Sequence, residues 1–278
     1  MGEANTQVVI AGAGHAGGSA AAMLRQLGWK GGITLIGEEP LPPYQRPPLS
    51  KAWLTGDANE DSLLLRPAAF YPDASIEMRL GVRVTGIDRT GRTVALSDGS
   101  LVGYDHLILA LGARARRLPL PGLDLAGVLE LRSAADADQL KAELRPGAHL
   151  AVIGGGYIGL EAAASARALG AAATVIERED RVLARVACPV LSDYFTAYHR
   201  SRGVEIITDA QVMALEGTDG RVGGVRLGDG RVIPCSAVLI GVGAVPNDEL
   251  AAAAGLACDN GIIADQNAQT SDPLICAI

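Results

Sequence analysis

The residues with the clearest chemical meaning are glycines, and they occur in two clusters. Residues 8–17 read VVIAGAGHAG and residues 150–159 read LAVIGGGYIG, so each cluster is an apolar run that ends in G-x-G-x-x-G. In such a turn the first glycine makes the bend, the second lets the backbone approach a pyrophosphate, and the third lets the following helix pack against the strand. The pattern therefore indicates two dinucleotide-binding turns, each with phosphates at a helix N-terminus.

The context of both turns strengthens this interpretation. A bare glycine pattern is weak evidence, and it gains weight from a strand before it, a helix after it and an acidic residue about 20 positions further on. Glu38 follows the first turn at about that spacing, and Glu177 follows the second. Each carboxylate can accept the ribose hydroxyls of an adenosine. The alternative is two ordinary strand–helix units whose glycines serve packing only.

Glu177 also bears on the kind of nicotinamide dinucleotide. A 2′-phosphate would be repelled by this carboxylate, which favours NADH over NADPH. Arg178 and Arg181 lie close to it in the sequence and could offset the repulsion.

The elements that must position these residues alternate as strands and helices. After the first turn we expect a helix over residues 19–27 and a strand over 33–37, and after the second a helix over 160–169 and a strand over 173–176. Residues 76–102 alternate between apolar and polar and contain turn signals, which predicts strands of a β-meander or of the main sheet's edge. The pattern predicts an α/β protein with two Rossmann-like dinucleotide-binding domains.

Two buried strands that end in glycine are the expected places where the chain crosses between these domains. They cover residues 105–112 and 237–243. The first domain is then predicted to contain residues 1–115 and 243–278, and the second residues 116–242. At 278 residues the chain fits two domains of ordinary size.

Composition excludes several classes of function. The net charge of −7 argues against general nucleic-acid binding. No apolar stretch reaches the length of a membrane-spanning helix, and residues 1–7 lack the basic and apolar regions of a signal peptide, so a cytoplasmic protein is expected. The four cysteines, Cys188, Cys235, Cys258 and Cys276, show neither a C-x-x-C pair nor a metal-ligand cluster with the histidines. They are interpreted as small apolar core residues.

Several segments together resemble the NADH-dependent ferredoxin reductases of bacterial oxygenase systems, a family that includes the putidaredoxin reductases and the aromatic-ring dioxygenase reductases. These segments are the first glycine turn, PYQRPPLSK at residues 43–51, GGGYIGLE at 154–161, GAVPN at 243–247 and TSDP at 270–273. The resemblance covers essentially the whole chain. It implies a glutathione reductase-like fold, with FAD in the first domain, NADH in the second and a small ferredoxin-type iron–sulfur protein as electron acceptor.

The resemblance also implies roles for individual residues. Contacts to FAD are implied for Gly12, Gly14, Ala16, Gly17, Glu38, Arg46, Pro47, Pro48, Lys51, Val84, Ala110, Gly112 and Arg132. Contacts to NADH are implied for Gly154, Gly156, Tyr157, Ile158, Gly159, Glu161 and Glu177, and Gly243 is expected to contact a cofactor. Glu161 would lie beside the nicotinamide and Glu177 on the ribose.

Lys51 and Glu161 are the candidate catalytic residues, on the hypothesis that they pair near the flavin N5 atom. The alternative for Lys51 is a solvated loop lysine, since lysines are mostly exposed. The alternative for Glu161 is a helix-surface carboxylate near the helix N-terminus. A short basic run, Arg114, Arg116 and Arg117, could steer an acidic ferredoxin or could be a solvated charge cluster.

The implied function is hydride transfer from NADH to FAD, followed by delivery of single electrons to the iron–sulfur protein of a monooxygenase or dioxygenase. A dithiol reductase is disfavoured because no cysteine precedes Cys188. Rubredoxin reductase and a truncated nucleotide-binding remnant stay open as alternatives. Family members have A-T-G where this chain has residues 110–112 (ALG), and they continue after residue 278 into a G-D motif and a third domain. The resemblance therefore implies that the C-terminal interface domain is absent from this chain.

Overall fold

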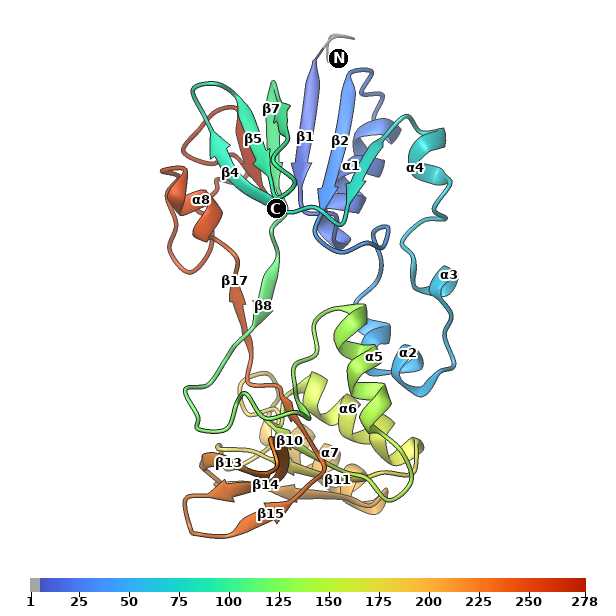
Figure 1. The fold of residues 1–278 in the computed structure, drawn as a ribbon, viewed down its shortest axis with the longest axis vertical. Helices are drawn as coiled ribbons and strands as arrows, with labels where there is room; N and C mark the ends of the chain where they lie inside the picture. Colours follow the sequence, from blue (N-terminus) through green and yellow to red (C-terminus); the bar gives the residue numbers. More distant parts are fainter. Residues whose placement is uncertain (1–5) are drawn as a thin grey trace. The chain divides into compact units, whose positions relative to one another are not determined.

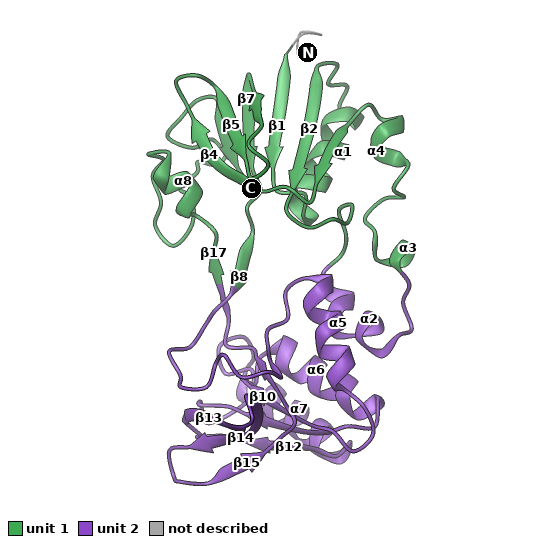
Figure 2. Cartoon of the chain, viewed as in Figure 1, with its two compact units in different colours: residues 1–45, 60–114, 245–278 green, residues 46–59, 115–244 purple. Residues whose placement is uncertain are grey.

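The structure is a computed structural model that describes residues 6–278, and these residues divide into two compact units (Figures 1 and 2). The first unit comprises residues 1–45, 60–114 and 245–278, and the second comprises residues 46–59 and 115–244. Residues 46–59 thus belong to the second unit, although they lie in the sequence between parts of the first. Residues 1–5, within the stretch where no signal peptide is expected, lie outside the described residues.

The first unit is built on a parallel sheet with the strand order β18-β7-β1-β2-β3. In this sheet Ala11 pairs with Ile36 on one side and with Leu109 on the other, so the carboxyl ends of the three central strands are level. The strands are β1 (Gln7–Ala11), β2 (Gly32–Gly37), β3 (Glu77–Leu80), β7 (His106–Leu109) and β18 (Ile275–Ala277).

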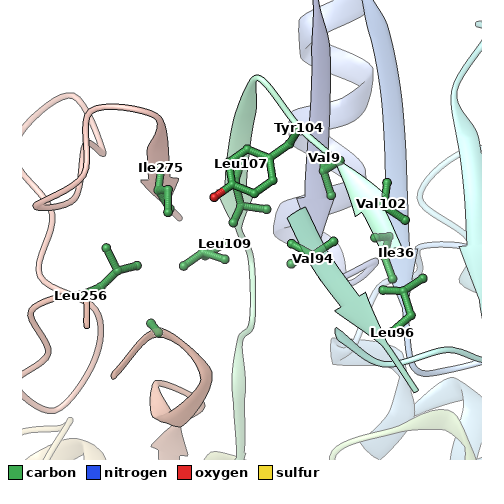
Figure 3. Packing of buried hydrophobic residues seen from close by; sticks show 12 residues of the cluster. Val9, Ile36, Val94, Leu96, Val102, Tyr104, Leu107, Leu109, Leu256 and Ile275 are labelled. Carbon is green, nitrogen blue, oxygen red and sulfur yellow. The ribbon is translucent and has the colours of Figure 1, made fainter. Parts of the chain in front are cut away.

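Both faces of this sheet are covered, which explains why its central strands are apolar on both sides. On one face Ile10 and Leu35 pack with Tyr71 of α4 (Phe70–Asp73) and with α1 (His15–Gln26). On the other face Val9 and Leu107 pack with an antiparallel sheet (Figure 3). That sheet consists of β4 (Val84–Asp88), β5 (Thr93–Leu96) and β6 (Leu101–Gly103). The alternating stretch at 76–102 therefore supplies both an edge strand of the main sheet, β3, and a separate meander.

The second unit repeats the same plan with the strand order β12-β11-β10-β16-β9, again all parallel. Its strands are β9 (Val128–Leu129), β10 (His149–Ile153), β11 (Ala172–Ile176), β12 (Val204–Ile207) and β16 (Ala237–Ile240). Helices α6 (Tyr157–Ala168) and α7 (Pro189–Ser201) pack on it, and the antiparallel strands β13 (Val212–Thr218), β14 (Arg221–Leu227) and β15 (Val232–Pro234) share a core with Ile153 and Ile176.

The prediction of two Rossmann-like units is thereby confirmed. In each unit the chain runs outward through three strands and then returns to the other side of the first, which creates a topological switch point between β1 and β7 and another between β10 and β16. Ligands of open parallel sheets bind at such points, beyond the carboxyl ends of the strands. The glycine turns follow β1 and β10, so both turns lie at switch points.

Short elements complete the units. The 3₁₀ turn η1 (Pro47–Ser50), α2 (Ala52–Thr55) and α5 (Ala134–Glu143) belong to the second unit, and α3 (Glu60–Leu63) and α8 (Glu249–Ala253) to the first. Strands β8 (Ala113–Ala115) and β17 (Ala244–Pro246) contain the boundaries between the units. Among residues 6–278, no helix is long and apolar enough to cross a membrane.

Candidate functional site

The first glycine turn joins β1 to α1, and its backbone leaves no room for side chains. Gly12 has a φ of +116°, and a Cβ atom placed on it would lie 2.1 Å from the Ala110 carbonyl oxygen. A Cβ atom on Gly17 would lie 1.8 Å from the Gly12 carbonyl oxygen. Only glycine fits either position, and the turn brings the predicted residues Gly12 and Ala110 into contact at the switch point.

The second turn has the same two constraints, and it also contains one glycine that packing does not require. Gly154 has a φ of +109°, and a Cβ atom there would lie 2.5 Å from the Gly241 carbonyl oxygen. A Cβ atom on Gly159 would lie 2.2 Å from the Gly154 carbonyl oxygen. By contrast, a Cβ atom on Gly156 would meet no atom of the described chain within 4 Å. Packing therefore does not require glycine at 156, and the open space there fits a closely approaching pyrophosphate.

The helices that follow the two turns begin without a side-chain cap. Gly14 is the N-cap of α1 and Gly156 the N-cap of α6, and neither helix has an acidic residue in its first turn. Helix α5 differs, because Ser133 and Asp136 cap its first turn reciprocally. First-turn amides need partners, and α7 also begins without a side-chain cap. What distinguishes α1 and α6 is that their uncapped first turns lie at the switch points, where an anion can bind.

The two predicted ribose carboxylates lie at the ends of β2 and β11. Glu177 faces the second turn, where its Oε2 accepts a hydrogen bond from the Gly155 amide at 2.6 Å and its Oε1 accepts one from the Glu179 amide at 2.9 Å. The Glu38 side chain is 66% exposed and makes a weaker contact with Arg83, 3.4 Å between Oε1 and Nη1. Glu38 is thus the more accessible of the two carboxylates.

The arginines that follow Glu177 have other partners. Arg178 Nη2 donates to Glu179 Oε1 at 2.7 Å. Arg181 donates to the carbonyl oxygens of Ala184 and Ala187. Neither guanidinium makes one of these contacts with the Glu177 carboxylate, which is held by backbone amides.

Tyr157 and Ile158 open α6 beside the space left by Gly156. Their side chains are 55% and 46% exposed, so the two neighbours together form an apolar surface at this end of the sheet. The corresponding residues of α1, His15 and Ala16, are also exposed. An apolar surface beside an anion-binding turn is what the nicotinamide half of a dinucleotide would cover.

Lys51 and Glu161 form an ion pair within the second unit, with 2.8 Å between Nζ and Oε2. Ser50 donates its hydroxyl to the same Glu161 oxygen at 2.6 Å, and Lys51 Nζ also donates to the Pro47 carbonyl oxygen at 3.2 Å. The lysine side chain is 50% exposed and the glutamate 31%. Both candidate catalytic residues are therefore held by partners, and they still present part of their surface to a ligand.

Segment 46–59, which carries Lys51, is anchored to α5 as well as to α6. The Arg46 guanidinium donates to the Arg132 carbonyl oxygen, which brings two predicted FAD-contacting residues together in the second unit. Trp53 Nε1 donates to Asp138 Oδ1 at 2.9 Å. Helix α5 has no counterpart among the sequence predictions, although the S-x-x-D pattern of its N-terminal cap was a usable signal.

The remaining predicted residues are spread over both units. Val84 begins β4 and packs against the hydrophobic cluster that contains Val9 and Leu107. Gly112 lines a cavity of about 200 Å³ together with Leu109 and Ile278. This cavity is smaller than most ligand pockets, which span roughly 300–1,000 Å³. Gly243 has a φ of +114°, and a Cβ atom there would lie 3.9 Å from Arg185, a cationic neighbour that the sequence did not single out.

The basic run mostly has local partners. Arg114 pairs with Glu249 and donates to Asn247 Oδ1 at 3.0 Å within the first unit. Arg117 pairs with Glu130 at 2.9 Å within the second unit. These contacts favour the solvated-cluster interpretation over a steering surface.

The cysteines offer no dithiol chemistry. All four are free thiols. Burial raises the pKa of Cys235 to about 11, and burial followed by the Asp248 charge raises the pKa of Cys258. The described residues contain no group of metal-ligating side chains that could hold an ion.

Comparison with known proteins gives concordant matches. The family model described as pyridine nucleotide-disulphide oxidoreductase matches residues 6–278. A probable ferredoxin reductase from Castellaniella defragrans is 51% identical over 99% of this chain and 67% of its own length. A rubredoxin-NAD(+) reductase from Pseudomonas putida is 43% identical over 98% of this chain and 70% of its own length.

A solved structure, the covalent putidaredoxin reductase–putidaredoxin complex, has a TM-score of 0.96 and 42% identity. The match covers 99% of this chain and 67% of that one. The chain thus spans about two thirds of the length of the relatives it matches.

Proposed function

The chain belongs to the pyridine nucleotide-disulphide oxidoreductase family, and we propose that it is an NADH:ferredoxin reductase. In this reaction hydride passes from NADH to bound FAD, and single electrons then pass to a ferredoxin-type iron–sulfur protein that serves a monooxygenase or dioxygenase. The observation that carries the proposal is the repeated glycine turn at a switch point, followed in both units by a helix without a side-chain cap. A protein that only binds nucleotides needs one such turn.

We assign FAD to the first unit and NADH to the second. Gly12, Gly17 and the α1 N-terminus would hold the FAD pyrophosphate, and Glu38 the ribose hydroxyls. The first-turn amides of α1, which have no side-chain cap, fit an anionic pyrophosphate. When bound, FAD supplies the capacity to accept two electrons as hydride and to release them one at a time.

In the second unit the α6 N-terminus would hold the NADH pyrophosphate, and Glu177 would accept the adenosine ribose hydroxyls. Because Glu177 carries a negative charge that neither Arg178 nor Arg181 neutralises by direct contact, a 2′-phosphate would be repelled. This supports NADH over NADPH. Tyr157 and Ile158 would cover the nicotinamide half.

The Lys51–Glu161 pair would set the charge next to the reacting rings. Glu161 holds the Lys51 ammonium at 2.8 Å, and a fixed positive charge stabilises negative charge that develops during hydride transfer. Because the ammonium is already oriented by Glu161 and Pro47, little reorganisation is needed when the charge develops.

The acceptor is proposed from the names of the relatives, which include ferredoxin and rubredoxin reductases. A rubredoxin is therefore the second candidate acceptor. A dithiol acceptor relay within this chain is not proposed, because burial keeps the Cys235 thiol protonated and the first cysteine is Cys188. We also propose a cytoplasmic location, since NADH is supplied there and the four cysteines are free thiols.

The direct test is purification of the chain in the presence of FAD, followed by anaerobic addition of NADH. We expect a yellow protein whose flavin absorbance bleaches with NADH, and more slowly with NADPH. Reduction of cytochrome c through an added [2Fe–2S] ferredoxin or an added rubredoxin then distinguishes the two acceptors. A colourless protein that binds NADH alone would instead identify a nucleotide-binding remnant.

A further inference from the structure

We infer that Ser165 is a positioning residue for the Lys51–Glu161 pair, an inference that rests on the function proposed for that pair. Ser165 lies on α6 one turn after Glu161 and is only 7% exposed. Its hydroxyl donates to the Ser50 carbonyl oxygen at 2.7 Å. This contact joins α6 to the residue immediately before Lys51.

Ser50 touches α6 at two points. Its carbonyl oxygen accepts from Ser165, and its own hydroxyl donates to Glu161 Oε2 at 2.6 Å. Because residues four apart on a helix share one face, these two contacts fix both the position and the orientation of Ser50 along α6. Ser50 is 4% exposed, so water cannot readily replace either contact.

The two contacts together determine where the lysine charge lies. Glu161 Oε2 receives donors from both Ser50 and Lys51, and Lys51 starts from a backbone position set by the Ser50 carbonyl contact. Without the Ser165 hydroxyl, the Ser50 carbonyl oxygen would be a buried acceptor without that donor. The backbone at 50–51 would then move toward solvent and carry the Lys51 ammonium away from its present place.

Helix stability and anchoring of the segment do not account for Ser165. Alanine stabilises a helix interior better than serine, and α6 has alanines on either side at 164 and 166. The rest of segment 46–59 is held independently by the Trp53–Asp138 hydrogen bond. What Ser165 adds is therefore local to Ser50 and Lys51.

The first test needs no cofactor. In the FAD-free protein, Ser165→Ala should raise amide hydrogen exchange at residues 49–56 by about tenfold, the change expected from losing one buried hydrogen bond. Ser192→Ala is the matched control, because Ser192 is a fully buried helical serine of the same unit that lies on α7. It should leave exchange at residues 49–56 unchanged. Unchanged exchange in Ser165→Ala would overturn the inference.

The second test uses the FAD-loaded protein and a double-mutant cycle. Ser165→Ala alone should slow flavin reduction by NADH by roughly tenfold, whereas in a Glu161→Gln background it should add little, because coupled residues are not additive. A full additional loss in that background would indicate a merely structural effect and overturn the positioning role. If wild-type protein binds FAD but NADH does not reduce it, the proposed function itself fails, and the exchange result still reports separately on the Ser165 contact.

Discussion

Thr34 and Thr174 occupy equivalent positions in the second strands of the two parallel sheets, and both hydroxyls link three strands. Thr34 is 2% exposed and accepts from Gln7 Nε2 at 2.8 Å on β1. It donates to Glu77 Oε2 at 3.1 Å on β3. A buried hydroxyl in the middle of a sheet is costly without partners, and Gln7 and Glu77 supply them for Thr34. The similarity of the two units therefore includes this buried polar group as well as the glycine turns.

In the second unit the partner on the first strand is a histidine. Thr174 lies 2.8 Å from His149 Nε2 and 2.9 Å from Glu205 Oε2. An ionised carboxylate can only accept, so the Thr174 hydroxyl donates to Glu205 and accepts from a protonated Nε2 of neutral His149. Where the first unit has glutamine, the second thus carries a group that titrates.

This histidine predicts a pH dependence of stability. Burial lowers the pKa of His149 below its usual 6.5, and Glu205 opposes this only in part. As the pH falls below 6.5, the unfolded chain therefore binds the proton first, and the folded protein loses stability. We expect the urea midpoint to fall between pH 7 and pH 5, with a slope of at most about 1.4 kcal/mol per pH unit from this group.

His149→Gln copies the first unit and keeps a donor for Thr174. It should flatten the slope without abolishing it, because burial also lowers the pKa of His199. An unaltered slope in His149→Gln would show that this histidine is not the source.

A substitution at Gly156 should affect ligand binding without affecting packing. Because a Cβ atom at this position would meet nothing within 4 Å of the chain, Gly156→Ala should leave the urea midpoint unchanged while raising the KM for NADH by at least about tenfold. Gly223→Ala is the matched control, since its Cβ also faces open space but lies on β14. Gly154→Ala should instead destabilise the unit, because its φ is positive and the Gly241 carbonyl oxygen is 2.5 Å away. Normal NADH kinetics in Gly156→Ala would show that the pyrophosphate does not bind at this turn.

The charge of Lys51 is tested by Lys51→Met. Loss of the ammonium should lower the flavin reduction potential and slow reduction by NADH by roughly tenfold or more. Glu161→Ala should weaken the charge-transfer absorbance that develops with NADH. Lys30→Met, at an exposed position in the first unit, is the control for loss of a lysine charge. A potential equal to that of wild type in Lys51→Met would refute the electrostatic role.

The features that could be predicted from the sequence are those with local causes. The glycine turns and the strand-to-carboxylate spacing follow from backbone geometry. The helices begin at His15 and Tyr157, three or four residues before the expected starts. The later starts are expected because glycine has a low helix propensity. Gly17 and Gly159 nevertheless lie in the first helical turn, because no larger residue fits against the turn backbone there.

The parts that could not be predicted depend on contacts between distant residues. Nothing near Lys51 in the sequence indicates that segment 46–59 belongs to the second unit, because its partners Glu161 and Asp138 lie far along the chain. Ser165 stands in an alanine-rich helix where a serine carries no pattern. Only the folded positions show that its hydroxyl meets the Ser50 carbonyl oxygen.

Two buried hydroxyls of the first unit differ in their partners and should respond oppositely to removal. The Tyr71 hydroxyl has no hydrogen-bond partner among residues 6–278, and burial raises the pKa of this phenol. Tyr71→Phe should therefore leave the free energy of unfolding unchanged or raise it by up to about 1 kcal/mol. Thr34→Val, which breaks two hydrogen bonds, should lower it by about 1–3 kcal/mol. Urea unfolding measures both, and a clear loss in Tyr71→Phe would reveal a partner for that hydroxyl.

Cofactor preference should depend on the charge at Glu177. Glu177→Gln keeps an acceptor for the Gly155 amide but removes the repulsion of a 2′-phosphate, so kcat/KM for NADPH relative to NADH should rise about tenfold, equivalent to about 1.4 kcal/mol. Glu179→Gln is the control, because it removes a neighbouring carboxylate whose partner is Arg178. It frees that guanidinium without touching the carboxylate at the turn, and its effect should be smaller. A ratio that responds to Glu179→Gln and not to Glu177→Gln would assign the discrimination to Arg178 and move the adenosine ribose away from the end of β11.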